Sequence, residues 1–99
     1  TMAALREAKK RGARILSIVN VVGSSIARES DDVLYTWAGP EIAVATTKAY
    51  STQMAVLNML GLYFGDILGT IDRETYSEMV RDLQRVPEYI EKNVLEVRE

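Results

Sequence analysis

The chain has 99 residues, of which 47% are hydrophobic and 26% are charged, and its formal net charge is -2. This length allows at most one domain, and the balanced charge gives no basic surface for nucleic acid and no attraction to an anionic membrane. The sequence has no histidine and no cysteine, which excludes a histidine general base, a thiol nucleophile, a disulfide framework and a Cys/His zinc site.

The first predicted element is a helix over Met2–Lys10, followed by a short strand. Basic residues near the end of this helix suit the negative end of its dipole, and Gly12 can supply a left-handed cap. The segment Arg14–Asn20 is short, β-branched and almost uncharged, which predicts a buried strand. A helix followed by a strand is half of a β–α–β unit, so we expect an earlier strand before Thr1.

A second strand is predicted a few residues later. The segment Gly23–Ser30 indicates a loop with at most one helical turn, and Asp32–Trp37 has the pattern of a strand. The sequence Gly39-Pro40 then interrupts the pattern, because proline disfavours helical geometry in the residue before it.

The longest predicted element is a helix over Val44–Leu68. Its apolar residues occur almost all round the helix, which predicts burial on several sides, between a sheet and a partner subunit. A membrane span is the alternative, but polar residues and glycines interrupt the apolar run and Lys48 and Asp66 limit its length. We therefore expect no membrane contact.

Two further helices are predicted after Gly69, which ends the long one. The first covers Asp72–Arg85; Pro87 either stops it or opens a new helix, and Glu88–Val97 continues the amphipathic pattern. Two strands are too few for a stable open sheet, so a sheet edge and a helix face should remain uncovered. Pairing with another chain, or a missing N-terminal half, would cover them.

The segment between the second strand and the long helix is the best candidate for a ligand site. Ligands collect outside the carboxyl ends of strands, and helix N-termini attract anions. Thr46 and Thr47 offer hydroxyl groups there, Lys48 a cation and Glu41 an acid. A purely structural interpretation is favoured on patterning alone: the threonines cap the helix, Glu41 complements its dipole, and Lys48 either extends its charged end into solvent or pairs with Glu41.

Other polar and aromatic residues have simpler interpretations. Ser24 and Ser25 are best explained as loop or helix caps. The tyrosines and phenylalanine of the long helix follow helical spacing and are typical of a core or an interface. A group of charged residues is most simply a solvated turn: Arg28, Glu29, Asp31 and Asp32.

Two separated motifs resemble a known family. The segment AGPEIAVATTKAYSTQ (Ala38–Gln53) closely resembles AG-[PT]-EI-x-VA-[ST]-TKA-[FY] in the first SIS (sugar isomerase) domain of the glucosamine-6-phosphate synthase family. The upstream run NVVGSSIARESD (Asn20–Asp31) is similar to that family's N-x-x-GSS-x-x-RESD, and Leu83–Pro87 to its L-x-x-[LV]-P. The spacing agrees from about Thr1 to Pro87.

The resemblance implies an α/β fold class: a partial SIS domain, half of a flavodoxin-like three-layer arrangement. It would contain two parallel strands, about four helices and the long apolar helix over 44–68. Residues 1–99 would form the C-terminal part of one SIS domain that is incomplete at its N-terminal side. The family transfers ammonia from glutamine onto fructose 6-phosphate and isomerises the product. It works as a homo-oligomer in the cytoplasm, without a metal or organic cofactor.

The residues carried over from the resemblance are few. Val44 matches a position that lines the sugar-phosphate pocket through its backbone, and Thr46 matches a nearby hydroxyl position. The family's phosphate loop would precede Thr1 and its catalytic groups belong to other domains, so this chain alone is expected to be inactive. Two alternatives stay open: an SIS sugar-phosphate isomerase or deglycase without a glutaminase domain, and a stand-alone oligomerisation module.

Overall fold

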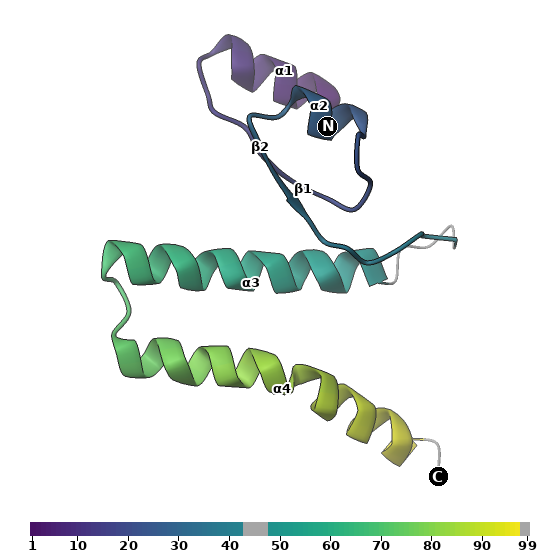
Figure 1. Ribbon diagram of the computed structural model, residues 1–99, viewed down its shortest axis with the longest axis vertical. Helices are drawn as coiled ribbons and strands as arrows, with labels where there is room; N and C mark the ends of the chain where they lie inside the picture. The colour runs from purple at the N-terminus through teal and green to yellow at the C-terminus, as the bar shows by residue number, and fades with distance from the viewer. Residues whose placement is uncertain (43–47, 98–99) are drawn as a thin grey trace. The chain divides into compact units, whose positions relative to one another are not determined.

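The computed structural model describes residues 1–42 and 48–97 of the chain (Figure 1). They form six elements, in the order α1 (Met2–Lys10), β1 (Leu16–Val19), α2 (Ser25–Glu29), β2 (Asp32–Tyr35), α3 (Lys48–Leu68) and α4 (Arg73–Val97). The chain divides into two compact units, Thr1–Val56 and Leu57–Glu99, and α3 runs from the first into the second.

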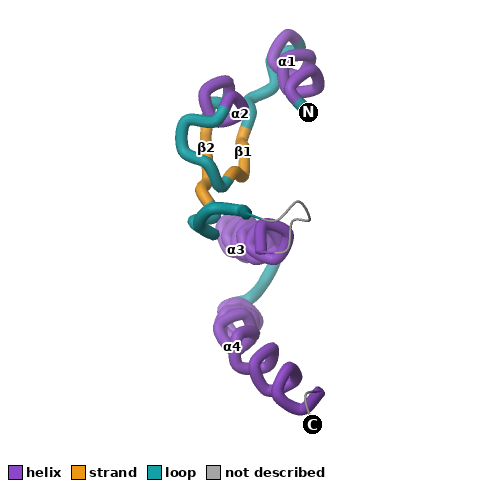
Figure 2. The backbone as a smooth tube through the Cα atoms, turned by 90° about the vertical axis from the view of Figure 1, so that its right-hand side faces the viewer, coloured by secondary structure: helices purple, strands orange, loops and turns teal. Residues whose placement is uncertain are grey.

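The first unit is built on a β–α–β arrangement. Strands β1 and β2 pair in parallel, with Leu16 opposite Asp32 and Val19 opposite Tyr35 (Figure 2). A parallel pair needs a crossover of about a dozen residues or more, and the segment containing α2 provides it. Both predicted strands are thus confirmed, although each is shorter than the sequence pattern indicated and β1, predicted to be buried, is buried only at Ser17.

Helix α1 ends as its sequence predicts. Gly12 has a φ of 84°, its N–H donates to the carbonyl of Lys9, and the N–H of Ala13 donates to the carbonyl of Ala8. This pair of bonds is the Schellman motif, which satisfies helix carbonyls that would otherwise lack partners. The glycine is required because its backbone is left-handed.

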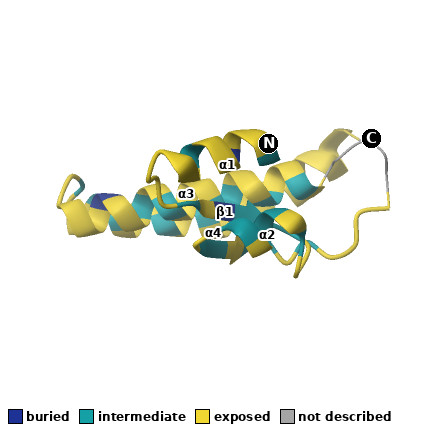
Figure 3. Cartoon of the chain, turned by 90° about the horizontal axis from the view of Figure 1, so that it is seen from above, coloured by how far each residue is buried: buried dark blue, intermediate teal, exposed yellow. Residues whose placement is uncertain are grey.

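The described residues form very little core. The buried residues among them are Leu5, Ser17 and Gly65, and the cartoon in Figure 3 is coloured mostly as exposed. Within the single chain Leu57, Met59 and Tyr63 of α3 are more than half exposed, so the burial of this helix against a partner subunit stays a prediction. Among the described residues, none of the helices has the length and apolar character needed to cross a membrane.

The second unit contains the last part of α3, and this helix ends with the same capping motif as α1. Gly69 has a φ of 66° and donates to the carbonyl of Asp66, while the N–H of Thr70 donates to the carbonyl of Gly65. The side chain of Ile71 folds back over Gly65, where an added Cβ would lie 3.0 Å from its Cδ1. Gly65 therefore permits a close contact that alanine would obstruct.

Helix α4 corrects the prediction of two separate helices. It begins after Asp72, whose carboxylate accepts the N–H of Thr75 at 2.7 Å as an N-cap, and it continues through Pro87 to Val97. The ribbon changes direction in the second half of the helix (Figure 1). Proline has no N–H group, so one backbone hydrogen bond of the helix is lost. Because this part of α4 is exposed, water can bind to the carbonyl that is left without a partner. The amphipathic pattern before and after Pro87 is compatible with one continuous helix.

Candidate functional site

The candidate site lies where the two parallel strands end. β1 leads into Asn20, and β2 leads into the segment Thr36–Gly39, so both segments meet at the carboxyl edge of the sheet. Open α/β sheets bind ligands at this edge, where loops rather than hydrogen-bonded strands present their polar groups. In Figure 1 the chain leaves β2 at this edge and continues toward α3.

The amide side chain of Asn20 connects the two strand ends. Its Oδ1 accepts bonds from the Thr36 hydroxyl at 3.1 Å and from the Ala38 N–H at 2.9 Å. Its Nδ2 donates to the carbonyl of Gly39 at 2.7 Å. One half-buried residue after β1 thus holds three residues that follow β2.

Trp37 lies inside the segment that Asn20 holds, and its backbone is unusual. Its φ is 52°, in the left-handed region that bulky residues avoid, and this turn explains why β2 ends at Tyr35 rather than at Trp37 as predicted. The indole is 76% exposed, with its ring centroid 5.7 Å from that of Tyr35. Such backbone strain persists where neighbouring bonds impose it and often marks functional segments.

The structure places the predicted site residues as follows. Val44, Thr46 and Thr47 lie outside the described residues, so their predicted roles stay predictions. Glu41 is exposed, and within the described part of the chain it forms no ion pair with Lys48. Lys48 is the first described residue of α3, and an added Cβ at Gly39 would lie 3.8 Å from its Nζ. This ammonium group therefore lies beside the segment held by Asn20.

Serine hydroxyl groups hold both ends of helix α2, which connects the two strands. Ser24 caps the helix by accepting the N–H of Ala27, which confirms the capping interpretation of this residue. Ser30, just after α2, donates to the carbonyl of Ile26 and lies 2.5 Å from the hydroxyl of Ser17 in β1. These bonds attach both ends of a short helix and explain why five residues suffice to form it.

The charged segment around α2 is more ordered than the predicted solvated turn. Arg6 of α1 makes a two-bond contact with Glu29, at 2.7 and 3.0 Å, and Arg14 makes a similar contact with Asp32. Asp31 accepts the backbone N–H of Ile15 at 2.7 Å. The charged groups are exposed, as predicted, but the prediction missed these contacts because the partners lie 16 to 23 residues away in the sequence.

These contacts lower the pKa of two carboxyl groups, those of Glu29 and Asp32. The hydrogen bond from Arg6, followed by its positive charge, lowers the pKa of the Glu29 carboxyl despite partial desolvation. The hydrogen bond from Arg14 lowers the pKa of Asp32 in the same way. Both groups are therefore held ionised as structural partners, which does not suit a general acid.

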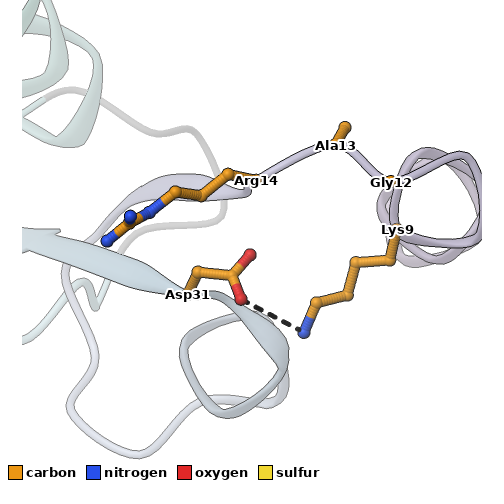
Figure 4. A pocket seen from close by; sticks show the side chains of 5 residues that line it. All are labelled: Lys9, Gly12, Ala13, Arg14 and Asp31. Carbon is orange, nitrogen blue, oxygen red and sulfur yellow. Dashed lines mark ion pairs between the residues drawn. The ribbon is translucent and has the colours of Figure 1, made fainter.

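A shallow pocket of about 580 Å³ lies at the opposite edge of the sheet, beside the loop before β1. Figure 4 shows the Lys9 side chain reaching toward Asp31, with 4.0 Å between the charged atoms, while Arg14 extends in another direction. Arg14 is already paired with Asp32, and Lys9 also donates to the carbonyl of Glu29. Since each cation is compensated and the strands begin here, we assign no ligand to this pocket.

Residues 1–63 match the SIS domain family. This match covers most of the chain, including both strands, the Asn20 contacts and the first part of α3. The chain belongs to the SIS domain family. The match agrees with the α/β arrangement of two parallel strands and four helices described above.

The SIS chain is also similar to several bacterial proteins named glutamine–fructose-6-phosphate aminotransferase (isomerizing). It is 56% identical over 92 residues to the protein of Clostridium tetani, covering 93% of the chain and 15% of the relative. For Symbiobacterium thermophilum the identity is 59% over 88 residues, covering 89% and 14%. For Thermus thermophilus it is 45% over 98 residues, covering 99% and 16%. The chain thus spans about 15% of the length of these relatives.

Sequence reasoning on the SIS motifs missed the role of one residue. Asn20 was matched as part of the motif that ends at Asp31, but no contact was predicted for it. The available signal is an asparagine immediately after a strand, combined with a later Gly-Pro break, because asparagine can bond to backbone groups in both directions. Which segment it would hold depends on the pairing of the two strands, and no local pattern gives that pairing.

Proposed function

We propose that this chain is part of an SIS domain in an enzyme that uses glutamine and fructose 6-phosphate to make glucosamine 6-phosphate. The observation that carries the proposal is the 56% identity over 93% of the chain to an aminotransferase named for these two substrates. Identity at this level along nearly the whole chain includes the segments at the carboxyl edge of the sheet, where a ligand would bind.

Within this enzyme we assign sugar-phosphate binding to Val44 and Thr46. The support is their place in the sequence: they precede Lys48 and follow the segment held by Asn20, and that segment lies at the edge of the sheet where α/β proteins bind ligands. A backbone group at Val44 and a hydroxyl at Thr46 suit a polyhydroxylated phosphate ester, and the ammonium of Lys48 adds a favourable charge. No residue of the chain is assigned a catalytic role.

The remaining features of the proposal concern the larger protein. We place the chain in the C-terminal part of one SIS domain, with the flavodoxin-like three-layer arrangement completed by other residues and with α3 covered by them or by a second subunit. The exposed apolar side chains of α3 support this arrangement. We further propose a cytoplasmic homo-oligomer, and we expect residues 1–99 alone to show no turnover.

The test uses the full-length protein with fructose 6-phosphate and glutamine, and it measures glucosamine 6-phosphate by mass spectrometry. Formation of this product, accompanied by release of glutamate, is the expected result. Conversion of sugar phosphates without consumption of glutamine would instead indicate an isomerase or deglycase and would contradict the proposal. Absence of any reaction with either substrate would contradict it as well.

A pair of variants tests the assigned site. Thr46→Ala should raise the KM for fructose 6-phosphate about tenfold, the equivalent of one hydrogen bond to a charged or polar ligand. Thr47→Ala is the matched control, because it removes the same group from the neighbouring position and should change the KM much less. Equal effects of the two substitutions would refute the assignment of Thr46.

A further inference from the structure

The contacts of Asn20 use its amide in a way that no other side chain reproduces. Its oxygen must face the Thr36 hydroxyl and the Ala38 N–H, because the N–H can only donate; its nitrogen must face the Gly39 carbonyl, which can only accept. Aspartate keeps the two acceptor contacts but repels the carbonyl of Gly39. Alanine loses all three bonds.

These three bonds enclose the strained residue. Thr36 and Ala38 are the neighbours of Trp37, and the Thr36 N–H also donates to the carbonyl of Val19 at 2.9 Å. With residues on both sides fixed to the end of β1, Trp37 retains a left-handed backbone, φ 52°, that its bulky side chain disfavours. Gly39, the third contact, also has a positive φ, 77°, so the chain turns twice while it is attached to Asn20.

We infer that Asn20 is a positioning residue for phosphosugar binding. It fixes the backbone of Thr36–Gly39, and Val44 and Thr46 follow these residues in the sequence. The inference rests on the proposed function, because it assigns the effect of Asn20 to the sugar-phosphate site. Asn20 itself is separated from Val44 and Thr46 in sequence and acts through Thr36–Gly39.

The test uses the full-length protein and compares Asn20→Ala with Asn20→Asp and with Thr36→Val. Loss of all three bonds should raise the KM for fructose 6-phosphate about tenfold, the equivalent of 1.4 kcal/mol, with a smaller change in kcat. Asn20→Asp, which loses one bond, should raise the KM about threefold, and Thr36→Val, which loses one hydroxyl contact, by less. A wild-type KM in Asn20→Ala would overturn the inference.

A second comparison separates positioning from general stability. Glycine at position 37 adopts the left-handed conformation without strain, so the Trp37→Gly background should need Asn20 less. We expect Asn20→Ala to raise the KM no more than about threefold in that background, compared with about tenfold in wild type. Equal effects in both backgrounds would overturn the inference, because Asn20 would then not act through the turn at Trp37.

The two proposals fail in different ways. If the wild-type protein does not convert fructose 6-phosphate, the proposed function fails and so does this positioning role. If the wild type converts it and Asn20→Ala keeps the wild-type KM, only the positioning role fails. Should Asn20→Ala not fold, Asn20→Asp in the two backgrounds decides between the same outcomes.

Discussion

The direction of the hydrogen bond between Ser17 and Ser30 determines how much stability each serine-to-alanine substitution should cost. Ser30 donates its only hydroxyl proton to the carbonyl of Ile26, so the bond of 2.5 Å between the two serines must be donated by Ser17. Ser17 is only 8% exposed and has little access to water. Ser30 is therefore both the acceptor for Ser17 and the link from β1 to α2.

We predict that Ser30→Ala destabilises the protein more than Ser17→Ala. The first substitution leaves the buried Ser17 hydroxyl without its acceptor, at a cost of about 1–3 kcal/mol, while the second removes the donor and costs about 1 kcal/mol or less. Urea denaturation of both variants, with Ser25→Ala as an exposed control, measures the difference. Equal losses from Ser30→Ala and Ser17→Ala would show that the direction assigned to the bond is wrong.

At the scale of elements, two ion pairs attach α1 and the loop before β1 to the rest of the first unit. Glu29 and Asp32 have a lowered pKa in the folded chain, chiefly through hydrogen bonds from Arg6 and Arg14. A lowered carboxyl pKa contributes stability above the unfolded value, about 4, and this contribution is lost as the pH falls through the lower folded value. The pairs are exposed, so the effect should be small.

The prediction is a change in acid sensitivity. Glu29→Gln and Asp32→Asn should each lower the melting temperature slightly at neutral pH and flatten its decrease between about pH 5 and pH 2. High salt should reduce the difference from wild type, because exposed charges are screened. Glu7→Gln is a useful comparison, since Glu7 pairs with Arg11 only four residues away, at the end of α1. Identical acid profiles in all variants would contradict the role of the two longer-range pairs.

Helix α4 allows a separate test at this scale. Pro87→Ala restores one backbone N–H in an exposed part of the helix and removes the ring that conflicts with the preceding turn. Because proline costs about 3 kcal/mol relative to alanine in a helix interior, we expect slower hydrogen exchange in residues 83–90 and more helical circular dichroism. Glu88→Ala, one position later, should have little effect. Faster exchange in Pro87→Ala would show that the proline stabilises this helix.

The elements were predictable where a local residue determines the backbone. Gly12 and Gly69 correctly mark the ends of α1 and α3, because a left-handed cap favours glycine. The continuity of α4 was not predictable, since proline is compatible with a helix end, a new helix or a bend. The end of β2 was missed for another reason: Trp37 belongs to a strand by composition, whereas its turn goes with long-range bonds that hold Thr36 and Ala38 to Val19 and Asn20.

For the molecule as a whole, the main feature is a large apolar surface that packing within the chain does not cover. Fully buried large side chains are absent from the described residues, and α3 exposes aliphatic and aromatic groups on more than one side. The sequence predicted this uncovered surface correctly, because two strands and several apolar helices cannot cover one another. It did not predict where the surface lies, since that depends on how each helix is oriented.

We predict that residues 1–99, produced alone, do not remain monomeric. Large exposed apolar patches usually lead to association, so light scattering should show a mass that grows with concentration above the 11.1 kDa of one chain. The double substitution Leu57→Lys and Tyr63→Lys, both at positions more than half exposed, should reduce association while the helix content by circular dichroism stays similar. Glu91→Lys, on the exposed part of α4, controls for added charge. A monodisperse monomer at high concentration would mean that the chain covers its own apolar surface, and the exposure of α3 would then be wrong.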